Sequence, residues 1–118
     1  MANPNIVGVT TINGNTIVSN VTTVFSNVLT NSAASNSVIK INNIIVSNYT
    51  SNNITTSVKL NRSAVDYYLA GFITVPGNST LVVMGKDTGI YLLEGDVIQA
   101  NVSANVSASL ITSFETIS

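Results

Sequence analysis

Apolar and polar residues alternate along most of this chain, and that alternation restricts its fold more than any other feature. In the segment NNITTSVKLN, every second residue from Ile54 to Leu60 falls on one face, and Lys59 lies with polar residues on the other. A period of two residues is typical of a half-buried β-strand. Val, Ile, Thr, Asn and Ser fill nearly every segment, so no long window keeps helical spacing with helix-forming residues. The sequence therefore predicts an all-β fold.

The positions of the strands follow from the same pattern and from the turns between them. We expect eight or nine strands after some merging of the segments 6–12, 15–19, 21–29, 37–47, 54–60, 64–75, 79–84, 90–93, 97–103 and 106–116. Many short strands with regular turn signals predict an antiparallel β-sandwich, jelly-roll-like, with an extended N-terminal segment. We expect residues 1–20 to form an arm that orders on assembly, or a first hairpin, and residues 21–118 to form the sandwich domain.

Three local signals add detail to this expectation. Asn13-Gly14 lies between β-branched runs, which is the strongest short signal for a hairpin turn. Pro76-Gly77 fits the two central positions of a type II turn, which would join a strand ending near Val75 to the segment STLVVMG. Both faces of the segment VDYYLAGFITV carry apolar residues, so we expect both to be at least partly covered.

Charge is unusually sparse. Only 8% of the residues are charged, against roughly 25% in an average soluble domain. Four cations are too few to neutralise several phosphates, so nucleic-acid binding is disfavoured. No apolar run is long enough for a membrane span, and MANPNIVGVT lacks the features of a secretory signal. Low, nearly balanced charge also favours association, which suits a protein that works inside an assembly.

Histidine and cysteine are both absent. Their absence removes the commonest general base, the usual partner of a nucleophilic serine, and the commonest ligands of transition metals. The glycines are scattered through turns, so none forms a phosphate-binding loop. The sequence therefore predicts a protein that is not an enzyme, with no catalytic residues, no cofactor-binding residues and no metal site.

One acidic segment, YLLEGDVIQA, leaves an alternative open. Glu94 and Asp96, with Asp87 nearby, could supply oxygen ligands to calcium or act as a general acid and base. The favoured interpretation is structural: Gly95 allows a bend between two strands, and an aspartate in such a bend can accept hydrogen bonds from neighbouring backbone amides.

The tyrosines leave a second alternative open. Tyr49, Tyr67, Tyr68 and Tyr91 could form a platform on which sugars stack. Tyr67 and Tyr68 are adjacent, so in a strand they point to opposite faces and at most one joins any single patch. Packing against the sheet, with the hydroxyls at the rim, is favoured. Tyrosines clustered with asparagines on one exposed patch would instead support glycan binding.

Two long segments, VTTVFSNVLTNSAASNSVIKINNIIVSN and VPGNSTLVVMGKDTGIYLLEGDVIQA, carry a family resemblance. Over residues 21–118 the chain resembles small virion structural proteins of tailed bacteriophages, especially those that infect marine cyanobacteria. The resemblance implies a non-enzymatic component of the virion, assembled in the host cytoplasm as a homo-oligomer, with a trimer favoured. The expected role is a decoration or cement protein that binds the major capsid protein and stabilises the head. A neck or tail component and a glycan-binding attachment module are the alternatives.

Overall fold

The computed structural model describes residues 11–85, 90–104 and 108–118. Within these ranges the chain forms strands and turns, with no helix. The described strands are β1 (Ile12–Val21), β2 (Ser26–Thr30), β3 (Val38–Asn48), β4 (Ile54–Arg62), β5 (Val65–Val75), β6 (Thr80–Met84), β7 (Ile90–Leu92), β8 (Val97–Val102) and β9 (Ala108–Ile117).

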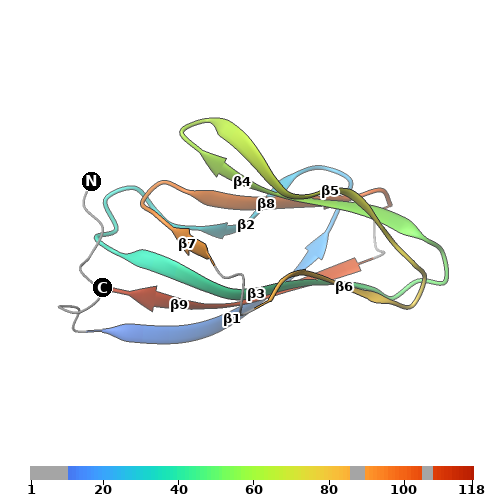
Figure 1. Cartoon of the computed structure of the whole chain (residues 1–118), viewed down its shortest axis with the longest axis horizontal. Coiled ribbons are helices and arrows are strands. Elements are labelled where there is room, and N and C mark those ends of the chain that lie inside the picture. Colours follow the sequence, from blue (N-terminus) through green and yellow to red (C-terminus); the bar gives the residue numbers. More distant parts are fainter. Residues whose placement is uncertain (1–10, 86–89, 105–107) are drawn as a thin grey trace.

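These strands form two antiparallel sheets that lie one over the other (Figure 1). Sheet A has the order β1-β9-β3-β6, and β7 also pairs with β3. Sheet B has the order β2-β8-β4-β5. The prediction of an all-β fold built from antiparallel sheets is therefore confirmed.

The core fills the space between the two sheets. Alternate residues of the central strands point inward, and most of the fully buried ones are aliphatic, including Ile41, Ile44 and Leu110 from sheet A and Val58 and Ile98 from sheet B. Burial of a side chain of this size stabilises a fold by about 1.5–3 kcal/mol. The apolar positions of the alternating pattern thus correspond to the residues on the inner faces of the two sheets.

The start of the described chain differs from the prediction. β1 is one continuous strand that pairs with β9 from Ile12 opposite Ile117 to Val21 opposite Ala108. Asn13 and Gly14 lie inside it, so the predicted hairpin turn is wrong, because pairing with β9 overrides the local turn signal. The boundary expected at residue 20 falls within the end of this strand, and residues 1–10 lie outside the described part of the chain.

The turn after β5 connects the expected strands with a different geometry. It joins Val75 to Thr80 and carries the chain from sheet B to sheet A. The positive φ falls on Asn78, at 57°, and not on Gly77, so the predicted type II turn at Pro76-Gly77 is wrong. Gly77 is needed for another reason: a Cβ there would collide with the carbonyl oxygen of Ser51.

β5 also departs from expectation. It is an edge strand of sheet B, and most of its side chains are exposed on both faces. The exposed apolar residues are Val65, Tyr67, Tyr68, Phe72 and Ile73. The partial cover expected for both faces is limited to the middle of the strand, where Leu69 packs against the core and the adjacent Ala70 is buried, because the edge position leaves β5 with one strand neighbour, β4, in sheet B.

Candidate functional site

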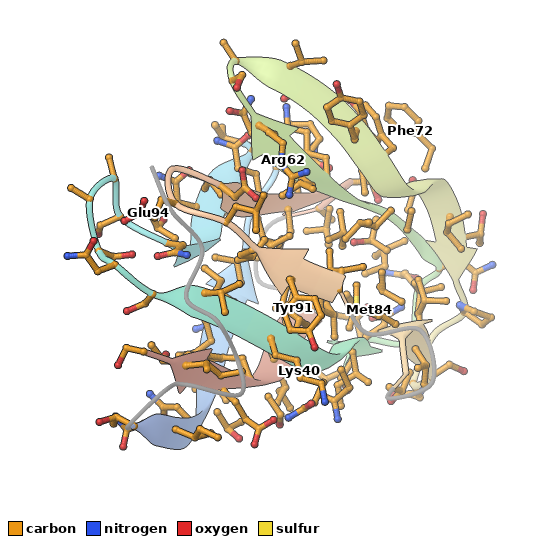
Figure 2. The ribbon with its side chains drawn as sticks, turned by 60° about the vertical axis from the view of Figure 1, so that its left-hand side comes forward. Lys40, Arg62, Phe72, Met84, Tyr91 and Glu94 are labelled. Atoms are coloured by element: carbon orange, nitrogen blue, oxygen red, sulfur yellow. The ribbon has the colours of Figure 1, made fainter. Side chains whose placement is uncertain are left out.

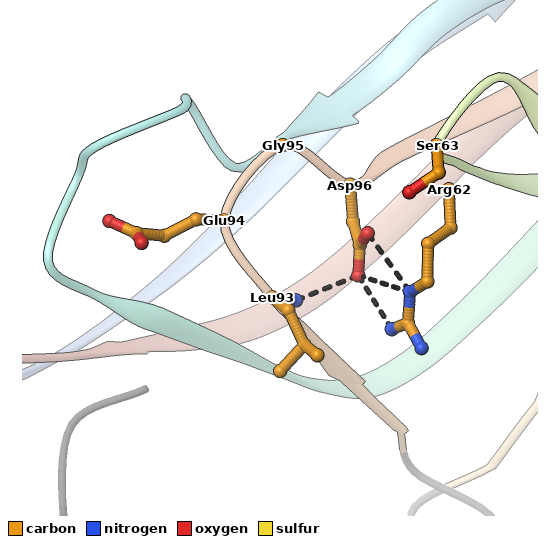
Figure 3. A pocket seen from close by; sticks show the side chains of 6 residues that line it. All are labelled: Arg62, Ser63, Leu93, Glu94, Gly95 and Asp96. Carbon is orange, nitrogen blue, oxygen red and sulfur yellow. Dashed lines mark hydrogen bonds and ion pairs between the residues drawn. The ribbon is translucent and has the colours of Figure 1, made fainter. Parts of the chain in front are cut away.

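The acidic segment forms a tight bend between β7 and β8 (Figure 3). Gly95 has a φ of 85°, a conformation that glycine adopts without steric cost. The Asp96 carboxylate accepts a hydrogen bond of 2.8 Å from the backbone N–H of Leu93, and the Asp96 N–H donates to the Leu93 carbonyl at 3.0 Å. The predicted bend at Gly95 and the predicted backbone hydrogen bond to Asp96 are confirmed.

Asp96 has a second partner that the sequence did not reveal. The Arg62 guanidinium, from the end of β4, donates to both carboxylate oxygens, with its Nη2 2.6 Å from Oδ2. Asp96 is buried, and Arg62 is partly exposed on the wall of a shallow pocket of about 330 Å³. The hydrogen bond to Asp96 raises the pKa of Arg62. This ion pair ties β4 to the bend that precedes β8.

Glu94 points away from Asp96 (Figure 3). It is buried, and its carboxylate accepts a hydrogen bond of 2.6 Å from the backbone N–H of Asn36. The two carboxylates therefore serve separate partners. The residues described here contain no group of three or more acidic, histidine or cysteine side chains placed to hold a metal ion. Asp87, the third member of the calcium hypothesis, lies outside the described residues.

A different cluster occupies the outer face of sheet B, and we call it the aromatic patch: Phe25, Lys59, Tyr68 and Phe72. The Tyr68 ring lies edge-on to Phe25 and stacks with Phe72, with centroids 6.4 Å apart in both pairs. The Lys59 ammonium lies 4.0 Å from the centroid of the Phe25 ring. The three aromatic rings thus form a chain of contacts near the open edge of the sheet, and the lysine lies over the Phe25 ring.

The lysine charge is balanced within the patch. Lys59 is almost buried, and its ammonium lies 2.9 Å from a carboxylate oxygen of Asp66. Asn61 donates to the other oxygen of Asp66 at 2.7 Å. The hydrogen bonds from Asn61 and Lys59 lower the pKa of Asp66. A partner that meets this face therefore meets aromatic rings and a neutralised ion pair.

Phe72 is the most exposed aromatic side chain of the patch, at 71% (Figure 2). Its φ is 51°, which is rare for a bulky residue and costs on the order of 1–3 kcal/mol. It lies where the pairing of β4 and β5 shifts register, and its N–H donates to the Ser57 hydroxyl at 2.9 Å. A shallow groove of about 200 Å³ runs beside the ring, lined by Thr55, Ser57, Asn101, Val102 and Ser103.

The tyrosine platform, the alternative to packing against the sheet, does not form as a single surface. Tyr67 and Tyr68 pair with Leu60 and Lys59 of β4, which point to opposite faces of sheet B. Tyr91 lies in sheet A, opposite Lys40. Only Tyr68 belongs to the aromatic patch, although all four tyrosines are exposed. Sequence reasoning missed Phe25 and Phe72; Gly71 next to Phe72 was the available signal, since glycine inside a strand often marks a bulge.

No family model matches the sequence, and no curated protein shows significant similarity to it. The described part of the chain has no helix of the length and apolarity needed to cross a bilayer.

Proposed function

We propose that this protein is a structural component of a tailed-phage virion, a jelly-roll decoration or cement protein that binds the head shell as a homo-oligomer. The observation that carries the proposal is the aromatic patch beside the open edge of sheet B. The low charge of the chain and the resemblance to small virion proteins support the same role.

The strand order supports the jelly-roll part of this proposal. The chain alternates between the sheets, from β1 in sheet A to β2 in sheet B, back to β3, and on to β4 and β5. It returns through β6 to sheet A, crosses to β8 in sheet B, and ends in β9 beside β1. Two interleaved Greek keys produce such an alternation, and jelly-roll folds are common in viral capsid proteins.

The patch has the chemistry of a docking surface. Exposed aromatic side chains supply large contact areas at low entropic cost, and they are enriched among the residues that dominate binding energy. β5 adds an open strand edge, whose backbone groups can pair with an extended segment of a partner. Lys59 and Asp66 already neutralise one another, so docking does not leave either charge unpaired.

Co-sedimentation with shells of the protein's own major capsid protein tests this role. We expect the wild-type protein to bind in fixed stoichiometry, and Phe72→Ala to weaken binding at least about tenfold, as for an aromatic anchor worth 1.4 kcal/mol or more. Tyr91→Ala, an exposed aromatic on sheet A, is the matched control and should bind normally. Binding to purified necks or tails in place of shells would contradict the decoration role.

One observation favours glycan binding as a second candidate. The stacked rings of Tyr68 and Phe72 lie beside a groove whose polar lining is neutral, with hydroxyls and the Asn101 amide. Sugars stack on such rings and hydrogen-bond to such groups. Titration with neutral oligosaccharides, followed through chemical shifts of Phe72 and Asn101, tests this candidate, and unchanged shifts at millimolar sugar would remove it.

A further inference from the structure

The outer face of sheet A carries a continuous row of aliphatic side chains, one from each of four adjacent strands. Val18 lies opposite Ile111, Ile111 opposite Ile45, and Ile45 opposite Val82. Neighbouring residues on these strands, such as Ile17, Leu110 and Val46, pack toward the core, so the row points outward. Val18 and Val82 are 72% and 61% exposed. We call these four residues the aliphatic row.

Neutral polar rows lie on both sides of the aliphatic row. Asn20, Ser109, Ser47 and Thr80 form one, and Thr16, Ser113 and Asn43 form the other. Hydroxyl contacts such as Thr16 Oγ1 to Ser113 Oγ, at 3.1 Å, confirm that the second row shares one face. The charged residues Lys40 and Glu115 lie opposite one another one row further out. Among the described residues, the centre of the face therefore carries no charge, and Lys40 and Glu115 lie at its rim.

We propose that this face packs against the same face of a second copy of the chain. A two-fold axis that runs parallel to the strands, past the middle of the aliphatic row, places row against row, with Val18 of each copy near Val82 of the other. It also places each polar row against the same row of the other copy, and hydroxyls and amides can both donate and accept hydrogen bonds. Lys40 and Glu115 stay at the rim, where water reaches them.

The area of the face is sufficient for such a pairing. β9 has ten residues, and sheets have strands about 4.8 Å apart that rise about 3.3 Å per residue, so the face is about 19 Å wide and 33 Å long. Allowing for the short β6, each copy contributes roughly 550 Å² on these dimensions. The total of roughly 1,100 Å² passes the lower limit of about 1,000 Å² for specific interfaces.

This pairing specifies the homo-oligomer of the proposed function, and it rests on the proposed function only for that homo-oligomer. A face-to-face contact produces a dimer, in contrast to the trimer expected from the family resemblance. It does not require a shell, because the aromatic patch lies on the other sheet. Self-association of the free protein and binding to shells can therefore fail independently.

Light scattering during size-exclusion chromatography of the full chain tests the pairing. We expect a mass of twice 12.3 kDa at high concentration. Val18→Glu with Val82→Glu should give the single-chain mass, since two carboxylates cannot be buried in the contact. Phe72→Ala, on sheet B, is the matched control and should keep the double mass. Circular dichroism of the glutamate variant should match the wild type, because both sites are exposed.

Each other outcome overturns the pairing. A single-chain mass for the wild type up to millimolar concentration excludes it, and so does a trimer. A dimer that survives the two glutamates while the fold is intact lies on a different surface. As a check of the arrangement, a mixture of Val18→Cys and Val82→Cys should form a disulfide between the two variants; a cross-link within the Val18→Cys variant alone would overturn the antiparallel arrangement of the rows.

Discussion

The two outer faces of the sandwich expose apolar side chains in contrasting ways. Sheet A presents an aliphatic row between neutral polar rows, whereas sheet B presents exposed aromatic rings beside a neutralised ion pair. A face of regular rows can meet a copy of itself, whereas exposed rings suit pockets on a different partner. The same low-charge composition therefore yields two surfaces with different uses.

The contrast has its origin in strand pairing. β1 and β9 pair over their whole length without a shift, and the shifts of β3 in sheet A, before Asn43 and before Ile45, leave Ile45 opposite both Ile111 and Val82. The pairing of β4 with β5 shifts twice, near Val58, and Phe72 takes a positive φ there. Such a bulge bends the strand and redirects its side chains, so it turns an ordinary edge strand into one that displays an aromatic ring.

The largest predicted effect is the loss of stability when the Arg62–Asp96 ion pair of sheet B is broken. Asp96→Asn should lower the free energy of unfolding by about 2–3 kcal/mol, because it removes the buried charge that holds Arg62. Glu115→Gln, on the outer face of sheet A, is the control and should change stability by less than about 0.5 kcal/mol. Urea denaturation measures both. Equal effects of the two substitutions would contradict a structural role for the ion pair.

A second substitution tests the inner side of sheet A. Thr112 is fully buried, and its hydroxyl has no hydrogen-bond partner within the described residues. Thr112→Val should therefore stabilise the protein by about 1–2 kcal/mol, since it replaces an unsatisfied hydroxyl by a methyl group of the same size. The matched control is Thr56→Val, because the Thr56 hydroxyl donates to the Asn101 carbonyl at 3.0 Å. The midpoint temperature of thermal unfolding should rise for Thr112→Val and not for Thr56→Val.

The strain at Phe72 gives a smaller effect. Phe72→Gly and Phe72→Ala both remove the ring, but only glycine adopts the positive φ freely, so the glycine variant should be more stable by about 1 kcal/mol. Chemical denaturation of the two variants measures the difference. A more stable alanine variant would mean that the backbone at this position has relaxed out of the bulge.

The smallest predicted effect is on the stability of the protein at acid pH. The pKa of Asp66 is lowered in the folded state, so the stability it contributes is present above the unfolded value of about 4 and is lost as pH falls through the lower, folded value. Asp66→Asn should therefore flatten the loss of stability below pH 4, measured by urea midpoints across a pH series. Identical acid dependence of the two proteins would show that Asp66 has no preferred partner in solution.

Local patterns predicted much of this fold. Alternation located most strands, and the bend at Gly95 followed from its sequence neighbours. The error at Asn13-Gly14 arose because local signals do not report which strands become neighbours. The same limit hid Arg62 as the partner of Asp96, which is 34 positions away. Phe25 and the aliphatic row likewise became visible only once the register across sheets was known.

The separate use of the two faces is tested most directly by analytical ultracentrifugation of protein and shell mixtures, which reports the mass of free protein and the fraction bound in one run. Phe72→Ala should remain a dimer and bind shells at least about tenfold more weakly. Val18→Glu with Val82→Glu should become a monomer that still binds, more weakly because one copy replaces two. The separate use of the two faces is contradicted if one variant, with its fold intact, loses both self-association and shell binding. It is also contradicted if both variants keep wild-type self-association and wild-type shell binding.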